Sequence, residues 1–137
     1  MNSGINIPDE VRAEFQALRL KRKYRYIIMK VNDAKDGVEV EKTGAREESF
    51  DEFKENMPKN NSRWVVYDLE WNADDGRKLS KLLFILFAPD DNLDKAERFV
   101  VTCNKDQVKS KMSETNRDLQ VNSWDELDHD KFIAQFN

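Results

Sequence analysis

Hydrophobic and polar residues alternate along several short segments of the chain, which is the pattern of β-strands with one exposed face. Residues 24–32 and 38–43 form one such pair, and the segment between them ends in Asp-Gly, a strong hairpin signal. Residues 63–71 and 79–88 form a second pair around the turn sequence NADDG, and 79–88 is the most apolar of the strands. We therefore expect two hairpins, with 79–88 in a central position, and a further short strand over residues 117–121.

Three segments carry the start signals and the apolar spacing of helices. Pro8 begins the first, and the acidic residues after it suit the positive end of a helix dipole. Ser49 and Glu52 form a capping box at the start of the second, which Pro58 ends. Asp128 is the N-cap of a short C-terminal helix.

This order of elements predicts an α/β (α+β) fold, with a central mixed sheet of roughly four to six strands and helices on both faces. A chain of 137 residues is large enough to bury one core of its own. We therefore expect a single domain over residues 1–137, in which residues 1–7 are a mobile N-terminal tail.

The segment 89–112 follows the most apolar strand and can be read in two ways. Wound as one helix of about 3.6 residues per turn, it separates an apolar side from a basic side. The apolar set is Leu93, Ala96, Val100 and Cys103, and the basic set is Lys95, Arg98, Lys105 and Lys109. The centre of the segment, 98–103, is β-branched and aromatic and favours a strand by local propensity alone. As a helix, it would present a basic stripe suited to an acidic partner.

Composition narrows the class of protein. Charged residues make up 36% and hydrophobic residues 39% of the chain, and the net charge is −4, so we expect a soluble globular protein that does not bind nucleic acid. No apolar run approaches the roughly 20 residues that a membrane helix needs. The N-terminus lacks the basic and apolar regions of a secretory signal. A single cysteine excludes an internal disulfide and suits a reducing compartment.

No arrangement of residues predicts catalysis. The single histidine, His129, stands among acidic residues at a helix start, and the single cysteine, Cys103, is expected on the apolar side of its segment. One histidine and one cysteine are too few for the usual zinc site, and the four glycines stand at separate turns instead of in a phosphate-binding loop. We therefore expect a binding protein and not an enzyme, with no catalytic residues, no metal and no cofactor.

A set of short motifs follows one another along the chain. They are Ser3-Gly4-Ile5, Pro8-Asp9-Glu10-Val11, KYRYII at 23–28, EVEKT at 39–43, SFDEF at 49–53, Met57-Pro58, RWVVYDLEW at 63–71, Ser80-Lys81, Pro89-Asp90 and NKD at 104–106. In this order and spacing they resemble the actin-depolymerising factor/cofilin family over nearly the whole chain. The resemblance implies the ADF-homology, gelsolin-like fold. It also implies that 89–112 is a long, kinked helix that wedges between two actin subdomains, with Phe99, Val100 and Cys103 packed on the sheet.

The resemblance further implies an actin-binding protein that binds monomers and promotes the severing and depolymerisation of filaments. The monomer-binding residues would be Ser3, Gly4, Ile5, Lys95, Arg98, Lys105, Lys109 and Met112. The filament-binding residues would be Arg77, Lys78, Lys81 and Lys131. Ser3 matches a serine that is phosphorylated in some relatives, and the basic residues of the long helix match ones that bind phosphoinositides. The expected protein is a cytoplasmic monomer associated with the cytoskeleton.

Two departures from the family pattern predict weaker binding to filaments. Leu79 stands where the family has a basic residue, two positions before Lys81, and Lys131 is the only lysine or arginine of the last helix. We therefore expect monomer binding with weaker stable filament binding. The alternative is a glia maturation factor-like protein that acts on the actin-related branch-nucleating complex. The turn at 75–77 (DGR) leans towards it, while the Ser-Gly-Ile tail and YDLEW at 67–71 lean more strongly towards cofilin.

Overall fold

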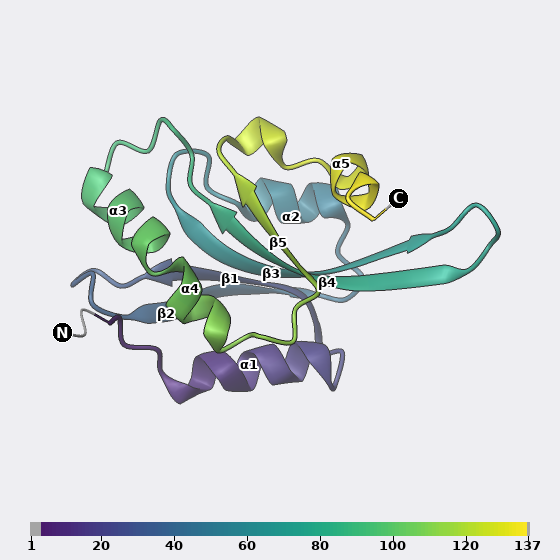
Figure 1. The fold of residues 1–137 in the computed structure, drawn as a ribbon, viewed down its shortest axis with the longest axis horizontal. Helices are drawn as coiled ribbons and strands as arrows, with labels where there is room; N and C mark the ends of the chain where they lie inside the picture. The colour runs from purple at the N-terminus through teal and green to yellow at the C-terminus, as the bar shows by residue number, and fades with distance from the viewer. Residues whose placement is uncertain (1–3, 137) are drawn as a thin grey trace.

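The computed structural model describes residues 4–136, and its centre is a five-stranded sheet in the order β2-β1-β3-β4-β5. The strands are β1 (Tyr24–Val31), β2 (Val38–Ala45), β3 (Arg63–Asn72), β4 (Lys78–Phe87) and β5 (Arg117–Val121). Neighbouring strands are antiparallel except for β4 and β5, which are parallel. The sheet confirms the predicted mixed fold and both hairpins, and the far end of the β3–β4 hairpin projects beyond the body of the molecule (Figure 1).

Helices cover both faces of the sheet, as predicted (Figure 1). They are α1 (Asp9–Arg19), α2 (Phe50–Asn56), α3 (Lys95–Cys103), α4 (Lys105–Ser110) and α5 (His129–Ala134), with a short 3₁₀ helix, η1, at Trp124–Glu126. The helices α1, α3 and α4 contribute to a first core, and α2 and α5 to a second. The strands supply both cores because successive side chains point to opposite faces. In β1, for example, Met29 enters the first core and Ile28 the second.

The helix starts follow the capping residues of the sequence. Ser49 Oγ accepts a hydrogen bond from the Glu52 N–H at 3.1 Å, and the Glu52 carboxylate accepts one from the Ser49 N–H at 3.0 Å. Asp128 Oδ1 likewise accepts from the Lys131 N–H at 3.0 Å. These bonds satisfy backbone donors that have no partner within the helix, so the predicted capping box and the predicted cap of α5 are confirmed.

The N-terminal segment is held against the body from Ile5 onward, which corrects the prediction of a mobile tail for that part of it. Ile5 is 6% exposed and packs in the first core. The Asn6 N–H donates to the Asp36 carbonyl at 2.8 Å, and the Asn6 carbonyl accepts from the Val38 N–H at 2.8 Å. Backbone pairing with the β1–β2 hairpin therefore anchors this segment. Residues 1–3 lie outside the described residues.

The segment 89–112 forms two short helices, α3 and α4, that meet at Asn104. The first of them begins after Asp94, whose Oδ1 accepts from the Glu97 N–H at 3.0 Å. At the junction, the Asn104 backbone N–H and side-chain Nδ2 both donate to the Val100 carbonyl, at 3.2 and 2.8 Å. A side-chain amide that binds the helix backbone competes with regular helical hydrogen bonds. The helix is therefore confirmed over the strand, with the kink that the family resemblance implies.

The side of α3 and α4 that packs on the sheet differs from the predicted side. The predicted buried residues are Leu93, Ala96, Phe99, Val100 and Cys103. Of these, Val100 packs against the first core and the others are exposed. The residues that are buried instead are Val101, Val108 and Met112, each 0% exposed. The prediction failed because apolar residues lie on more than one side of α3, and helical spacing alone does not show that the side with Val101 packs on the sheet.

Candidate functional site

The predicted basic stripe does lie along α3 and α4, but its members differ in how they are paired. Lys95 is exposed and has no ion pair among residues 4–136. Arg98 is held loosely: its Nη2 lies 3.4 Å from Asp90 Oδ1, and its Nε donates to the Pro89 carbonyl at 3.3 Å. In the N-terminal half of the stripe, Lys95 is therefore available to a partner, and Arg98 is held only by long contacts.

Lys105 and Lys109, in the C-terminal half of the stripe, both pair with Asp118 of β5. Lys109 Nζ lies 2.7 Å from Asp118 Oδ1, and Lys105 Nζ lies 3.3 Å from Asp118 Oδ2. Partial burial raises the pKa of the Asp118 carboxyl, but the hydrogen bonds and charges of the two lysines outweigh it and hold that pKa below its ordinary value. The sequence pattern did not indicate this pairing.

Two large apolar side chains beside the stripe were missed as candidates for binding. Leu93 is 89% exposed and Phe99 is 67% exposed. Phe99 stands four residues after Lys95, so the two share one side of α3, and this spacing could have identified it. Lys95, Arg98 and Phe99 line an open hollow of about 360 Å³. Large exposed apolar groups beside cations are typical of protein-binding surfaces.

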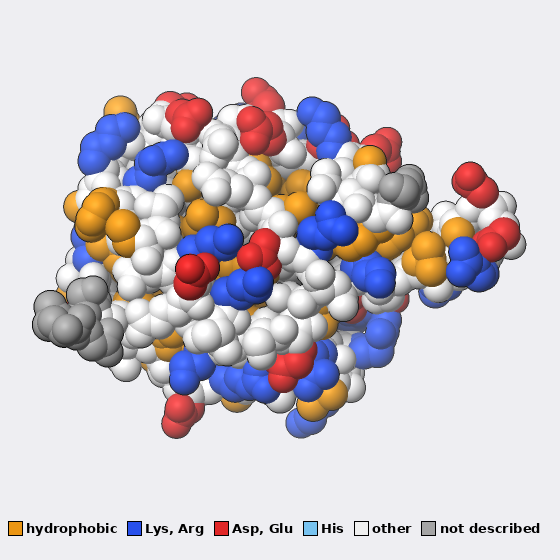
Figure 2. All heavy atoms as spheres, in the orientation of Figure 1, with side chains coloured by type: hydrophobic (Ala, Val, Ile, Leu, Met, Phe, Trp, Pro, Cys, Tyr) orange, Lys and Arg blue, Asp and Glu red, His pale blue; other side chains and the backbone are white. Residues whose placement is uncertain are grey.

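We call this region the α3–α4 surface. Its members are Leu93, Lys95, Arg98, Phe99, Lys105 and Lys109. In Figure 2, hydrophobic and basic side chains lie side by side over α3, at the left of the view. The surface therefore combines positive charge with apolar area, which is what recognition of an acidic protein partner requires.

The N-terminal segment joins the α3–α4 surface through Gln107 of α4. The Ile5 N–H donates to Gln107 Oε1 at 3.2 Å, and Gln107 Nε2 donates back to the Ile5 carbonyl at 3.3 Å. These two hydrogen bonds hold the exposed Gly4 beside α4. Ile5 and Met112, predicted as binding residues, instead turn their side chains into the first core. Their burial corrects the idea that these side chains are offered to a partner.

The predicted filament-binding residues divide between the projecting hairpin and α5. Arg77 and Lys78 are exposed at the far end of the β3–β4 hairpin, where Arg77 Nε pairs with Asp75 Oδ2 at 2.7 Å. Lys81 is half-buried further along β4, and Lys131 is exposed on α5. The structure thus places the four on two elements on one side of the molecule (Figure 1).

A groove of about 450 Å³ connects these two elements. Its apolar wall is formed by Trp71 and Leu79 of the hairpin and by Ile133 and Phe136 near the C-terminus. The rings of Trp71 and Phe136 stack with their centroids 5.5 Å apart. Leu79, which replaces an expected basic residue, therefore contributes apolar wall instead of charge to this groove.

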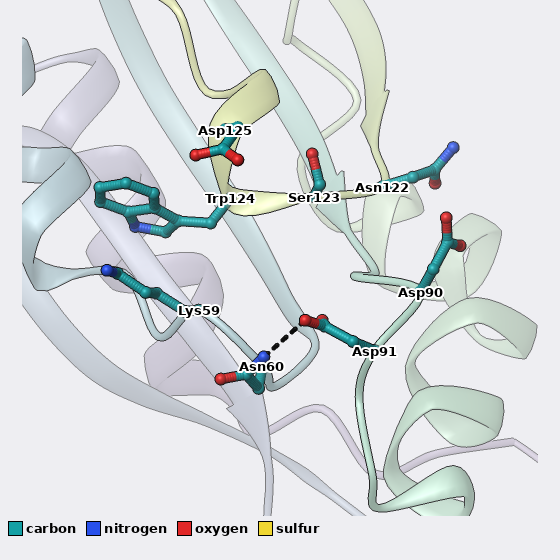
Figure 3. A pocket seen from close by; sticks show the side chains of 8 residues that line it. All are labelled: Lys59, Asn60, Asp90, Asp91, Asn122, Ser123, Trp124 and Asp125. Carbon is teal, nitrogen blue, oxygen red and sulfur yellow. Dashed lines mark hydrogen bonds between the residues drawn. The ribbon is translucent and has the colours of Figure 1, made fainter.

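A further hollow, also of about 450 Å³, lies between the loop after β4 and η1 (Figure 3). Its lining is polar and of mixed charge, with Asp91 bonded to Asn60 at 2.8 Å and Lys59 Nζ above the Trp124 ring at 4.5 Å. None of the predicted binding residues lines it. In the described part of the chain, no group of three or more His, Cys, Asp or Glu side chains is arranged to hold a metal ion, and no helix is long and apolar enough to cross a membrane.

Comparison with known proteins identifies the class to which this fold and surface belong. Residues 4–137 match the family model described as cofilin/tropomyosin-type actin-binding protein. Actin-depolymerizing factor 8 from Arabidopsis thaliana is 30% identical over 135 residues, covering 98% of this chain and 96% of its own length. Actophorin from Entamoeba histolytica is 32% identical over 133 residues, covering 97% of this chain and 95% of its own.

A solved structure agrees with these sequence relatives. Cofilin from Streptomyces griseoflavus superposes with a TM-score of 0.86 and 28% identity, over 96% of each chain. The family model and these relatives identify the five-stranded mixed sheet with its two-part helix α3–α4 as an actin-binding domain of the ADF/cofilin type. The chain belongs to the cofilin/actin-depolymerising factor family.

Proposed function

We propose that this protein binds actin monomers through the α3–α4 surface, and that it promotes the severing and depolymerisation of actin filaments. The observation that carries the proposal is Phe99. Phe99 is 67% exposed and lines one hollow with Lys95 and Arg98 of the same helix, so a large apolar group and two cations lie together, as in protein-binding surfaces. The names of the relatives, actin-depolymerizing factor and actophorin, support the same function.

The two kinds of side chain on this surface would play different parts in binding. Actin is acidic, so the cations would speed the approach of the two proteins and orient them more than they would add affinity. Phe99 and Leu93 would supply affinity because their apolar surface is removed from water when actin covers it. The exposed Gly4, fixed beside α4 by the Ile5–Gln107 bonds, would bring the N-terminal segment into the same interface.

The direct test is a titration of fluorescently labelled monomeric actin with the purified protein, followed by filament disassembly watched by microscopy. Lys95→Ala should weaken monomer binding by about twofold to fivefold, because a charge at the edge of an interface contributes little affinity. Lys42→Ala is the matched control, since Lys42 is exposed on β2 and also has no ion pair within residues 4–136. Equal affinities for the two variants would contradict the proposed surface.

For filaments, we propose binding that is weaker and less stable than monomer binding. Arg77 and Lys78 on the projecting hairpin support some filament contact, while Leu79 and the lone basic Lys131 of α5 support its weakness. Cosedimentation with polymerised actin should therefore saturate poorly under conditions in which monomer binding is complete. Tight, stoichiometric decoration of filaments would refute this part of the proposal.

We propose two forms of regulation of the same surface and a cytoplasmic, cytoskeletal location. A phosphate on Ser3 would add about −1.5 to −2 charge and would repel acidic actin, so Ser3→Glu should weaken monomer binding; unchanged binding would argue against the switch. Phosphoinositide headgroups would compete for the same cations, so anionic vesicles should displace actin. A monomer pull-down in which actin fails to bind would instead favour the glia maturation factor-like alternative.

A further inference from the structure

The C-terminal half of the basic stripe already has a carboxylate partner inside the protein. Lys105 and Lys109 stand four residues apart on α4, so they share one side of that helix. Asp118 lies opposite Phe84 in the β4–β5 register. Because Phe84 is part of the first core, the Asp118 side chain points to the face of the sheet that α4 covers. One carboxylate therefore receives both lysines, at 2.7 and 3.3 Å.

This arrangement is accessible to a partner. The side chains of Lys105, Lys109 and Asp118 are 30%, 35% and 29% exposed. The pKa of Asp118 is held below its ordinary value, despite partial burial, by the hydrogen bonds and charges of the two lysines, so the carboxylate is ionised near neutral pH. The pairing is partly exposed and weak, so carboxylates of a partner can reach both lysines and replace Asp118.

We propose that Asp118 is an internal counter-ion that occupies Lys105 and Lys109 in the free protein and is replaced by carboxylates of actin on binding. This inference rests on the proposed monomer-binding role of the α3–α4 surface. It makes Asp118 a positioning residue that limits the rate and affinity of actin binding, although its own charge has the same sign as the partner's surface.

The direction of the effect follows from the exchange. In the wild type, the two ion pairs with Asp118 must be broken or shared before carboxylates of actin can pair with the lysines. The freed Asp118 carboxylate then faces the carboxylates of actin and is repelled by them. Removing the charge of Asp118 abolishes both penalties. Because exposed ion pairs are individually weak, the loss of these two should strengthen actin binding by about threefold to tenfold.

The experiment measures the association rate and affinity of Asp118→Asn for labelled monomeric actin by stopped flow, over a series of salt concentrations. We expect faster association, tighter binding and a steeper decrease of the rate with salt, because two more cations are free to attract actin. Glu55→Gln is the matched control. It makes the same change in net charge on α2, which packs on the opposite face of the sheet. Asp118→Glu restores the carboxylate and should return the rate towards that of the wild type.

A second background tests whether Asp118 acts through the two lysines. In a Lys105→Gln/Lys109→Gln protein, adding Asp118→Asn should leave the association rate almost unchanged, because no cation remains to be released. Thermal unfolding of each variant separates this effect from a loss of structure in α4. If Asp118→Asn lowers the affinity or leaves it unchanged in a protein of wild-type stability, the inference is refuted. If the wild type itself fails to bind monomeric actin, the proposed function fails, and the inference with it.

Discussion

Phe99 gives the sharpest test of the proposed interface, because its contribution to binding can be estimated from its exposure. Complete burial of a phenylalanine side chain stabilises a complex by about 1.5–3 kcal/mol. Phe99 is 67% exposed in the free protein, so about two-thirds of this amount, roughly 1–2 kcal/mol, remains to be gained when actin covers it. Phe99→Ala should therefore raise the dissociation constant for monomeric actin by about 5- to 30-fold.

The stability of the free protein should hardly change in the same variant. Most of the Phe99 side chain faces water, and the packing of α3 on the sheet depends on Val101, whose carbonyl also accepts a hydrogen bond from Trp64 Nε1 at 3.0 Å. Thermal unfolding of Phe99→Ala should match the wild type within about 0.5 kcal/mol, as expected for a surface substitution. This separates a loss of binding from a loss of folding.

The assay is equilibrium titration of fluorescent monomeric actin, with Leu20→Ala as the matched control. Leu20 is also a large exposed apolar residue, 62% exposed, but it stands at the C-terminal end of α1, outside the α3–α4 surface. The control should bind actin as tightly as the wild type. A Phe99→Ala protein with wild-type affinity would refute the reasoning, and the proposed surface would then rest on charge alone.

Three further predictions concern packing, pH and filament binding. Gly44→Ala should destabilise the fold by about 1–3 kcal/mol in urea titrations, because a Cβ at this position would lie 2.0 Å from the Tyr26 ring. The hydrogen bond from Arg12 lowers the pKa of Glu114 from 4.5 to about 2. The pair therefore stabilises the fold fully above about pH 4.5, and this stabilisation is lost as the pH falls towards 2. Glu114→Gln should make the free energy of unfolding depend less on pH in this range. Leu79→Arg should increase cosedimentation with filaments, because it restores a cation beside Lys81.

The controls for these predictions come from the same chain. Leu20→Arg places an equal charge on an exposed leucine away from the hairpin, so it should not change filament binding. Glu55→Gln removes an exposed carboxylate without an ion pair among residues 4–136, and its stability should keep the acid dependence of the wild type. An unchanged urea midpoint for Gly44→Ala would mean that the Tyr26 ring can move aside.

The fold was largely predictable because most of its information is local. Alternation in 24–32 and 63–71, the Asp-Gly turn and the Ser49 capping box each depend on neighbours in sequence. The strand at 117–121 was also predicted, but its parallel pairing with β4 was not. That pairing depends on where α3 and α4 return the chain, which no local pattern encodes.

The site was less predictable because its details depend on contacts between distant segments. The basic stripe was found from helical spacing, but its inner side was misjudged because spacing alone does not show that Val101, and not Phe99 or Cys103, faces the sheet. Ile5 was expected to be free, whereas Gln107 binds its backbone from 102 positions away in the sequence. The Asp118 pairing likewise requires β5 to lie beside α4. Charges and spacing therefore located the surface, and tertiary contacts determined which of its members are available.

The anchoring of Ile5 by Gln107 has a practical consequence for experiments with fusion proteins. A tag joined before Gly4 would extend from the protein next to α4 and would hinder access to the α3–α4 surface. A tag joined after the last residue would instead begin next to Phe136, on the wall of the groove shared by α5 and the β3–β4 hairpin. The two fusions should therefore impair different activities, the first monomer capture and the second filament contact. Two otherwise identical fusion proteins, with the label at opposite ends, could thus separate the two activities without any substitution in the protein.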